Sequence, residues 1–344
     1  MTGGWIQYLA VFFSSAMFCL FLVPLAIRLS WRMGSLDHPG GYKRQSSPVP
    51  YLGGVAIVLA FSVATMVASL IRPPNAGHRE LNVILATALI LAAVGLLDDL
   101  KSLSPWARIL IEIGCGIVIW NLGVGVSLTG LNLVDYALTV LWVVGITNAF
   151  NLLDNMDGLA AGVVSIACAS YFAIAVTGDQ GFVATLAAGA IGCAVGFLRS
   201  NRYPARIYMG DGGALFLGFL VAYLGLKLKV AGDGYQTFLV PLLVCLIAIL
   251  DTTVVVVSRL KSGKSPFQGG QDHISHRLVH VGLPVPIAVG VIHLAALVVG
   301  TLAFICTRVD AVSVWIVGGL AGASALGAAV FFLAIPIYAE DRHS

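Results

Sequence analysis

Charged residues are scarce in this sequence. Asp, Glu, Lys and Arg together make up 10% of the 344 residues, whereas soluble globular domains use about 25%. Hydrophobic residues reach 59%, and the mean hydropathy is +0.96. This composition excludes a soluble globular protein and predicts an integral membrane protein. The net charge of +3 is also too small to indicate binding to nucleic acid.

Cysteine is sparse too, and its placement argues against two kinds of site. All six cysteines lie inside apolar runs and none forms a CxxC pair, so they are predicted to be inert packing residues rather than zinc ligands or redox centres. A cleavable signal peptide is not expected either, because the run from Trp5 to Ile27 is too long for a signal core and no small-residue cleavage pattern follows it. This run is predicted to be the first membrane helix.

Long apolar runs fill the rest of the chain and predict an all-α, multi-pass membrane protein with a single domain over residues 1–344. A membrane helix needs about 17 to 25 apolar residues, and eleven segments meet this requirement. Their approximate limits are 5–29, 51–71, 81–97, 105–122, 132–149, 157–177, 181–198, 212–230, 236–258, 285–306 and 312–338.

Lys and Arg are divided unevenly between the two sets of connections that alternate along eleven spans. One set holds 14 of the 19 basic residues and the other holds 5. Because basic residues accumulate on the cytoplasmic side, the N-terminus is predicted outside and the C-terminus in the cytoplasm.

Four polar segments stand at the ends of apolar runs, and the same alternation places all of them on the cytoplasmic side. They are LLDDLKSLSP (Leu96–Pro105), NAFNLLDNMDGL (Asn148–Leu159), IYMGDGGALFLGF (Ile207–Phe219) and SPFQGGQDHISHRL (Ser265–Leu278). Generic loops do not require so many acidic residues at helix ends. The convergence therefore predicts an active site on the cytoplasmic face.

The carboxylates and amides of the first two segments favour a hard cation. Asp98 and Asp99 are adjacent at a helix end, point about 100° apart and are expected to serve different partners. In the second segment, polar residues recur close to helical spacing and can share one face, namely Asn148, Asn151, Asp154, Asn155 and Asp157. Their oxygen atoms suit Mg²⁺, which leaves coordination positions open for substrate phosphates.

The other two segments favour an anionic ligand. Asp211 stands among glycines at a helix start, where exposed backbone N–H groups suit a diphosphate, although the Walker pattern GxxxxGK[ST] is absent. His273, His276 and Arg277 lie together in a polar segment and suit phosphate binding or general acid work.

Two acidic residues fall inside predicted spans. Asp251 is expected to face a cavity, because an intramembrane carboxylate is costly. Glu112 carries the same expectation, with snorkelling or a helix–helix hydrogen bond as the alternatives. His280 and His293 are treated as ordinary residues.

Taken together, the four segments resemble the polyprenyl-phosphate N-acetylhexosamine-1-phosphate transferases (glycosyltransferase family 4). LLDDL, NAFNLLDNMDGL, NRYPARIYMGDGGALFLGF and the histidine loop occur in the order and spacing of that family, over nearly the whole chain. KRQSSPVPYLGG (Lys43–Gly54) also resembles the basic, proline-rich lead into a Gly-Gly helix start that family members carry.

This resemblance implies transfer of a sugar 1-phosphate from a UDP-sugar to a polyprenyl phosphate such as undecaprenyl phosphate, with release of UMP, in a bacterial cytoplasmic membrane. The product would begin a cell-wall or surface glycan. A homodimer is compatible with the sequence, which does not determine the oligomeric state. Nor does it decide between one step and a two-step route through an acyl phosphate on an aspartate.

The resemblance also implies a role for each matching residue. Asn151 and Asp211 are expected to hold Mg²⁺, with Mn²⁺ as a substitute. Asp98, which has Asp99 beside it, is expected to deprotonate the lipid phosphate. The nucleotide pocket is expected at Asp154, Asp157, Gly158, Leu159, Asn201 and Tyr208, with Tyr208 against uracil. His273, His276 and Arg277 are expected to bind the diphosphate or sugar phosphate, with the two histidines as catalytic residues, and Lys43 is expected to bind a substrate.

The histidine loop bears on which sugar is transferred. DHISHRL lacks the His-His-His run of the muramoyl-pentapeptide branch and favours the N-acetylglucosamine branch. Members of that branch commonly carry adjacent histidines, so the muramoyl-pentapeptide and other N-acetylhexosamine specificities stay open. A secondary transporter is disfavoured because no internal repeat is evident. A CDP-alcohol phosphotransferase is disfavoured because its acidic residues would cluster on one helix pair.

Overall fold

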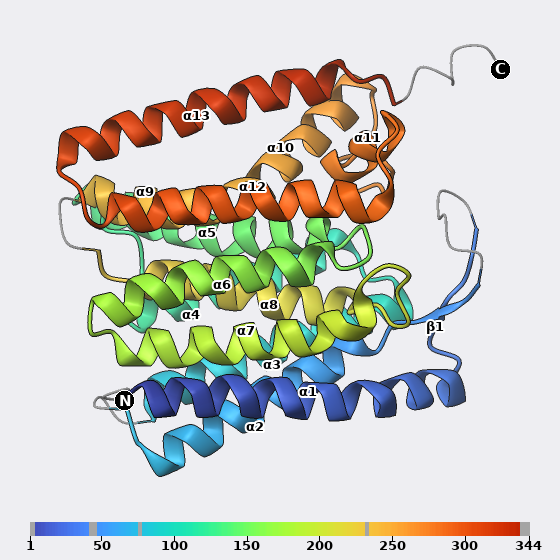
Figure 1. The fold of residues 1–344 in the computed structure, drawn as a ribbon, viewed down its shortest axis with the longest axis horizontal. Helices are drawn as coiled ribbons and strands as arrows, with labels where there is room; N and C mark the ends of the chain where they lie inside the picture. The colour runs from blue at the N-terminus through green and yellow to red at the C-terminus, as the bar shows by residue number, and fades with distance from the viewer. Residues whose placement is uncertain (1–3, 41–46, 75–77, 231–233, 338–344) are drawn as a thin grey trace.

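The structure, a computed structural model, describes residues 4–40, 47–74, 78–230 and 234–337. Most of its helices run side by side along one direction (Figure 1). The elements in chain order are α1 (Trp5–Met33), β1 (Leu36–Asp37), β2 (Val49–Pro50), α2 (Gly53–Ile71), α3 (Arg79–Lys101), α4 (Pro105–Asn121), α5 (Asn132–Leu153), α6 (Leu159–Thr177), α7 (Gly181–Asn201), α8 (Gly210–Lys227), α9 (Gly234–Val244), α10 (Leu246–Lys261), α11 (Ile274–His280), α12 (Val285–Cys306) and α13 (Ala311–Ala334).

Nine helices of the described residues are long and apolar enough to cross a membrane, which confirms a multi-pass membrane protein. The span expected at 236–258 is divided into α9 and α10, whose axes differ by 68°. Pro241 cannot donate a backbone hydrogen bond and lies one turn before this break. The span expected at 105–122 is α4, which has 17 residues and is too short for the same test. The single departure from an all-α fold among the described residues is the β1–β2 pair.

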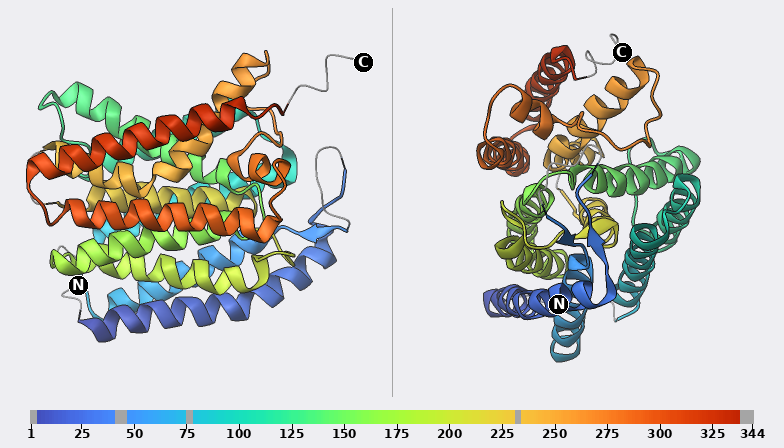
Figure 2. Two further views of the ribbon diagram at one scale, coloured as in Figure 1. Left: turned by 45° about the horizontal axis from the view of Figure 1, so that its top comes forward. Right: turned by 90° about the vertical axis from the view of Figure 1, so that its right-hand side faces the viewer.

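Helix α8 lies at the centre of the bundle (Figure 2). Every residue from Gly212 to Gly225 is buried, because the helix is apolar or glycine-rich all round and has no polar face to turn outward. Helices α2, α3, α5, α6 and α7 pack around it. By contrast, only 6% of the apolar stretch of α13 is buried, and this helix lies at the periphery of the bundle. The centre of the fold thus holds the helix whose first turn carries Asp211.

One end of the bundle, called the site end below, gathers the polar segments. Helices α3, α5 and α7 end there, and α4, α6 and α8 begin there. Strands β1 and β2 pair antiparallel at the same end (Figure 1), with Leu36 opposite Pro50. Pro50 accepts a backbone hydrogen bond of 2.8 Å from Tyr208, whose carbonyl in turn accepts one of 3.0 Å from Gly53. The segment before α8 is thereby held against the start of α2.

Helices α3 and α8 approach each other closely at Gly95. A Cβ atom at this position would lie 2.4 Å from the carbonyl carbon and oxygen of Asp211 and 2.5 Å from the nitrogen of Gly212. These are backbone atoms, so they cannot rotate away as a side chain would. The absence of a side chain at Gly95 therefore sets the position of Asp211.

Substituting Gly95 by Ala is expected to push α3 and α8 apart, at a cost of about 3 kcal/mol. Both the melting temperature in detergent and the activity of the Asp211 site should fall. Gly319→Ala on the outer helix α13 is the matched control, because a Cβ atom there meets no atom within 4 Å. A Gly95→Ala protein as stable as the Gly319→Ala protein would contradict this packing.

Candidate active site

Asp211 is fixed from two sides at the start of α8. Its Oδ1 atom accepts a hydrogen bond of 2.8 Å from the side-chain amide of Asn151, which lies on α5. Its backbone N–H donates to Oδ1 of Asp99, on α3, at 3.1 Å. Three helices distant in sequence therefore meet at this residue. Its side chain is 35% exposed, so a ligand can reach the carboxylate.

The Asp98–Asp99 pair stands in the last turn of α3, and its two carboxylates point to different partners, as the sequence predicted. Asp98 accepts the backbone N–H of Leu103 at 2.6 Å and forms an ion pair of 3.1 Å with Arg108. Asp99 turns instead toward the start of α8, where it accepts the N–H of Asp211. Neighbouring positions on a helix differ in direction by about 100°, which accounts for the division.

Asp98, Asp99, Glu112 and Asp211 form an acidic cluster, and Arg108 on α4 connects most of its members. Its Nη1 atom lies 3.1 Å from Asp98 and 3.4 Å from Asp211, and its Nη2 atom donates to Oδ1 of Asn148 at 3.3 Å. Its Nε atom lies 3.7 Å from Glu112, one turn further along α4. Glu112 is fully buried and accepts a hydrogen bond from the Asn148 amide, which confirms the helix–helix alternative. One guanidinium thus serves two half-buried carboxylates and one fully buried one.

Sequence reasoning missed the role of Arg108, because it counted this residue only among the basic residues that set the orientation. A local signal was present. Arg108 precedes Glu112 by four positions, the spacing at which helical side chains meet. Nothing in the sequence, however, indicated that Asp98 and Asp211 would both lie within reach.

The positions predicted for the nucleotide pocket gather around the connection between α5 and α6. The backbone N–H of Gly158 donates to the side-chain oxygen of Asn201 at 3.1 Å, and the amide of Asn201 donates to the carbonyl of Ile207 at 3.0 Å. Asp157 accepts the backbone N–H of Ala205 at 2.8 Å. Gly158 has a φ of 75°, a left-handed conformation that favours glycine. These bonds join the 154–158 loop, the end of α7 and the connection to α8.

Only some of these positions offer a side chain to a ligand. Asp154, Asp157 and Tyr208 are half-buried and border the polar region. Asn201 is 1% exposed and uses its side chain to brace the loop, while Leu159 is fully buried in the core. A nucleotide contact at Leu159 would therefore involve its backbone. Lys43 lies outside the described residues.

Carboxyl groups crowd together in this region. Burial raises the pKa of Asp154 to about 7, and the nearby carboxylates of Asp211, Asp99 and Asp157 act in the same direction. Burial also raises the pKa of Asp157, an effect that the N–H of Ala205 partly opposes. The pKa of Tyr208 is raised above its usual value by burial, with Asp157 contributing. Such a region favours a bound cation.

The histidine segment (residues 265–278) lies beside the same α5–α6 connection. Ser275 donates a hydrogen bond to the side-chain oxygen of Asn155, one turn beyond Asn151 on the chain. The rings of His273 and His276 meet edge to face with centroids 6.2 Å apart. The end of α5 and the loop that follows it therefore contact the acidic cluster and the histidine segment, respectively.

Arg277 is 1% exposed, which gives it a structural task that the sequence did not indicate. Its guanidinium donates to the carbonyls of Phe332 and Ile335 at the end of α13, each at 2.7 Å, and to the hydroxyl of Ser258 at 2.7 Å. Arg259 is buried likewise and makes a bidentate pair with Asp272, at 2.8 and 2.9 Å. These two arginines anchor the histidine segment to α10 and α13.

Comparison with known proteins agrees with this arrangement. A family model described as glycosyl transferase family 4 matches residues 81–229. A probable undecaprenyl-phosphate N-acetylglucosaminyl 1-phosphate transferase of Bacillus subtilis is 32% identical over 298 residues, which cover 84% of this chain and 82% of the relative. The chain belongs to glycosyl transferase family 4. The matched residues 81–229 of this family 4 protein run from α3 to just beyond α8 and include the whole acidic cluster.

More distant relatives of this family 4 chain carry similar names. A decaprenyl-phosphate N-acetylglucosaminephosphotransferase of Mycobacterium tuberculosis is 27% identical over 289 residues, covering 74% of this chain and 71% of the relative. An undecaprenyl-phosphate alpha-N-acetylglucosaminyl 1-phosphate transferase of Escherichia coli is 25% identical over 325 residues, covering 90% and 85%. The last match extends over most of the chain.

Proposed function

We propose that the protein transfers N-acetylglucosamine 1-phosphate from UDP-N-acetylglucosamine to a polyprenyl phosphate, with release of UMP, as the first membrane step of a cell-wall or surface glycan. The observation that carries this proposal is the meeting of Asp98, Asp211 and Arg108 at one end of a membrane bundle. Carboxylates that hold a hard cation beside an arginine that binds phosphate suit phosphoryl transfer. The names of relatives from three bacteria support the same reaction.

We place the site end in the cytoplasm of a bacterium, with the N-terminus outside. The 14-to-5 division of Lys and Arg supports this orientation. It also puts the site where a nucleotide sugar is made.

Mg²⁺ is the proposed cofactor, with Mn²⁺ as a substitute. Mg²⁺ is usually bound through one or two carboxylates together with water and substrate phosphates. The side chains of Asp211 and Asn151 lie next to each other and fit this requirement. Within the described residues, no group of three or more His, Cys, Asp or Glu side chains is placed to hold a metal by itself, so substrate phosphates would complete the shell. The bound cation would neutralise charge on the diphosphate.

The protein's own residues divide the remaining tasks. Asp98 takes the proton of the lipid phosphate, whose oxygen then attacks the sugar-side phosphorus in line. The bond from that phosphorus to the bridging oxygen breaks, and UMP leaves with this oxygen. Arg108 lies between Asp98 and Asp211 and binds the diphosphate oxygens, where charge accumulates during the transfer.

An apolar cavity of about 380 Å³ suits the polyprenyl chain. Its walls come mainly from α10, α12 and α13, and it reaches Leu153 at the end of α5, next to Asp154. A hydrocarbon chain in this cavity would have its head close to the loop that borders the acidic cluster. The cavity thus supports a lipid acceptor rather than a second soluble substrate.

The proposal is tested with purified protein, Mg²⁺, undecaprenyl phosphate and a set of UDP-sugars assayed side by side. UDP-N-acetylglucosamine is expected to release UMP with the highest kcat/KM, and mass spectrometry should find the polyprenyl diphosphate sugar. Faster turnover of UDP-N-acetylgalactosamine or the UDP-muramoyl-pentapeptide would support the proposed type of reaction but assign a different sugar to the donor. No UMP from any donor would overturn the proposal.

A further inference from the structure

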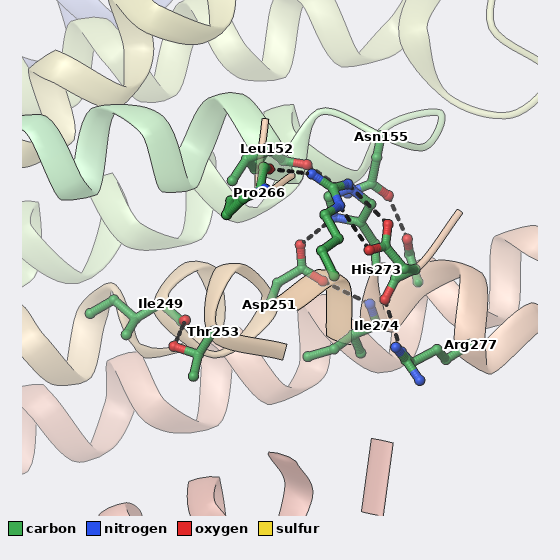
Figure 3. A network of polar contacts seen from close by, with 12 residues as sticks. Leu152, Asn155, Ile249, Asp251, Thr253, Pro266, His273, Ile274 and Arg277 are labelled. Carbon is green, nitrogen blue, oxygen red and sulfur yellow. Dashed lines mark hydrogen bonds and ion pairs between the residues drawn. The ribbon is translucent and has the colours of Figure 1, made fainter. Parts of the chain in front are cut away.

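Asp251 is an enclosed carboxylate on α10 to which the proposed reaction gives no task. It is 1% exposed, and both of its oxygen atoms are occupied by the histidine segment (Figure 3). Oδ2 lies 2.8 Å from Nδ1 of His273, and Oδ1 accepts the backbone N–H of Ile274 at 2.7 Å. A buried carboxylate is costly unless such bonds satisfy it. Asp251 therefore fixes the orientation of the His273 ring.

These two bonds also decide which nitrogen of the ring carries a proton. A backbone N–H can only donate, and an ionised carboxylate can only accept, so Nδ1 of His273 must hold its proton toward Asp251. The tautomer of a histidine is set by the bond that one of its nitrogens makes. The other nitrogen, Nε2, has no hydrogen bond within the described part of the chain, and in the neutral ring it keeps its lone pair.

His273 stands next to the proposed substrate site. Two residues further along, Ser275 is bonded to Asn155, which belongs to the loop that includes Asp154 and Asp157. The buried pair Arg259–Asp272 holds the residue that precedes His273. The ring is thus fixed by Asp251 of α10, and its segment is held by the loop and by the Arg259–Asp272 pair.

We propose that Asp251 is a positioning residue for the transfer reaction, holding His273 so that the Nε2 lone pair accepts a hydrogen bond from an O–H group of a bound substrate. This inference rests on the proposed function. The O–H group belongs to the sugar of the donor, because the single O–H of the lipid phosphate is assigned to Asp98. A weakened contact with the sugar raises KM for the UDP-sugar and leaves KM for the polyprenyl phosphate unchanged.

Replacing Asp251 by Asn tests the tautomer directly. The Asn amide offers one acceptor, which the N–H of Ile274 takes, so its NH₂ group faces Nδ1 and the proton of His273 moves to Nε2. We expect kcat/KM to fall about 10- to 100-fold, with part of it restored in Asp251→Glu. Thr253→Val is the matched control on α10, because the Thr253 hydroxyl bonds only to the carbonyl of Ile249 in its own helix.

A double-mutant cycle separates positioning from general stability. If Asp251 acts through His273, then Asp251→Asn combined with His273→Gln is no slower than His273→Gln alone. The proposal would be overturned if the losses of kcat/KM in the two single variants multiplied in the double variant, or if Asp251→Asn showed wild-type kinetics. The ¹⁵N NMR spectrum of histidine-labelled protein gives an answer independent of turnover: the Nδ1 and Nε2 shifts of His273 should exchange in Asp251→Asn. Unchanged shifts would refute the tautomer even if the proposed reaction itself failed.

Discussion

The Asp211→Asn protein is expected to release UMP about 1,000-fold more slowly than the wild type, measured as kcat with saturating substrates and Mg²⁺. Asparagine keeps the shape of the side chain and an oxygen that can accept the bond from Asn151. It removes the negative charge that a cation and its diphosphate require at this point. The fold should persist, because the backbone N–H of residue 211 still donates to Asp99.

Asp179→Asn provides the matched control for this prediction. Asp179 is exposed in the connection between α6 and α7, at the end of the bundle opposite the site. The same chemical change there should leave both kcat and the melting temperature at wild-type values. If Asp211→Asn turned over within threefold of this control, Asp211 would not hold the cation.

Replacing Arg108 by Gln is expected to lower kcat by about 100-fold or more, because the diphosphate loses its charged donor in the transition state. The melting temperature should fall as well, since Glu112 then stays buried without a cation at 3.7 Å and Asp98 loses its ion pair. Arg108→Lys should recover stability better than activity. Lysine restores the charge but presents it at a single nitrogen, whereas Arg108 uses one nitrogen for Asp98 and Asp211 and another for Asn148.

Arg199→Gln makes the same change of charge at the same end of the bundle. Arg199 is exposed near the end of α7, so its loss should affect neither kcat nor stability. UMP release and thermal unfolding of the three variants, measured in one detergent, give the comparison. A normal kcat in Arg108→Gln would show that Arg108 serves only as a counter-ion and that other residues bind the diphosphate.

Features that depend on local composition could be predicted from the sequence. A membrane helix must satisfy its own backbone and present about 20 apolar residues, so most spans are visible in a single window of sequence. The broken span was less visible. Pro241 marks a weak point in the helix but does not specify a 68° bend or the direction that α10 takes after it.

The residues of the site likewise include some that could be predicted from the sequence and some that could not. Asp98, Asp99, Asn151 and Asp211 could be chosen as candidates because polar side chains at helix ends are costly and conspicuous. Arg108 and Gly95 could not, because their importance comes from what lies opposite them. Gly95 looks like any small residue of an apolar helix until the backbone of Asp211 is placed against it.

The sequence by itself determined a membrane bundle and the residue types at its polar end, since hydropathy and charge are properties of each segment alone. Tertiary structure decided which side chains meet. Asn151 bonds to Asp211 across 60 positions, Arg108 reaches Asp211 across 103, and Asp251 fixes His273 across 22. Such contacts depend on how whole helices pack, and packing is a cooperative property that no single segment encodes.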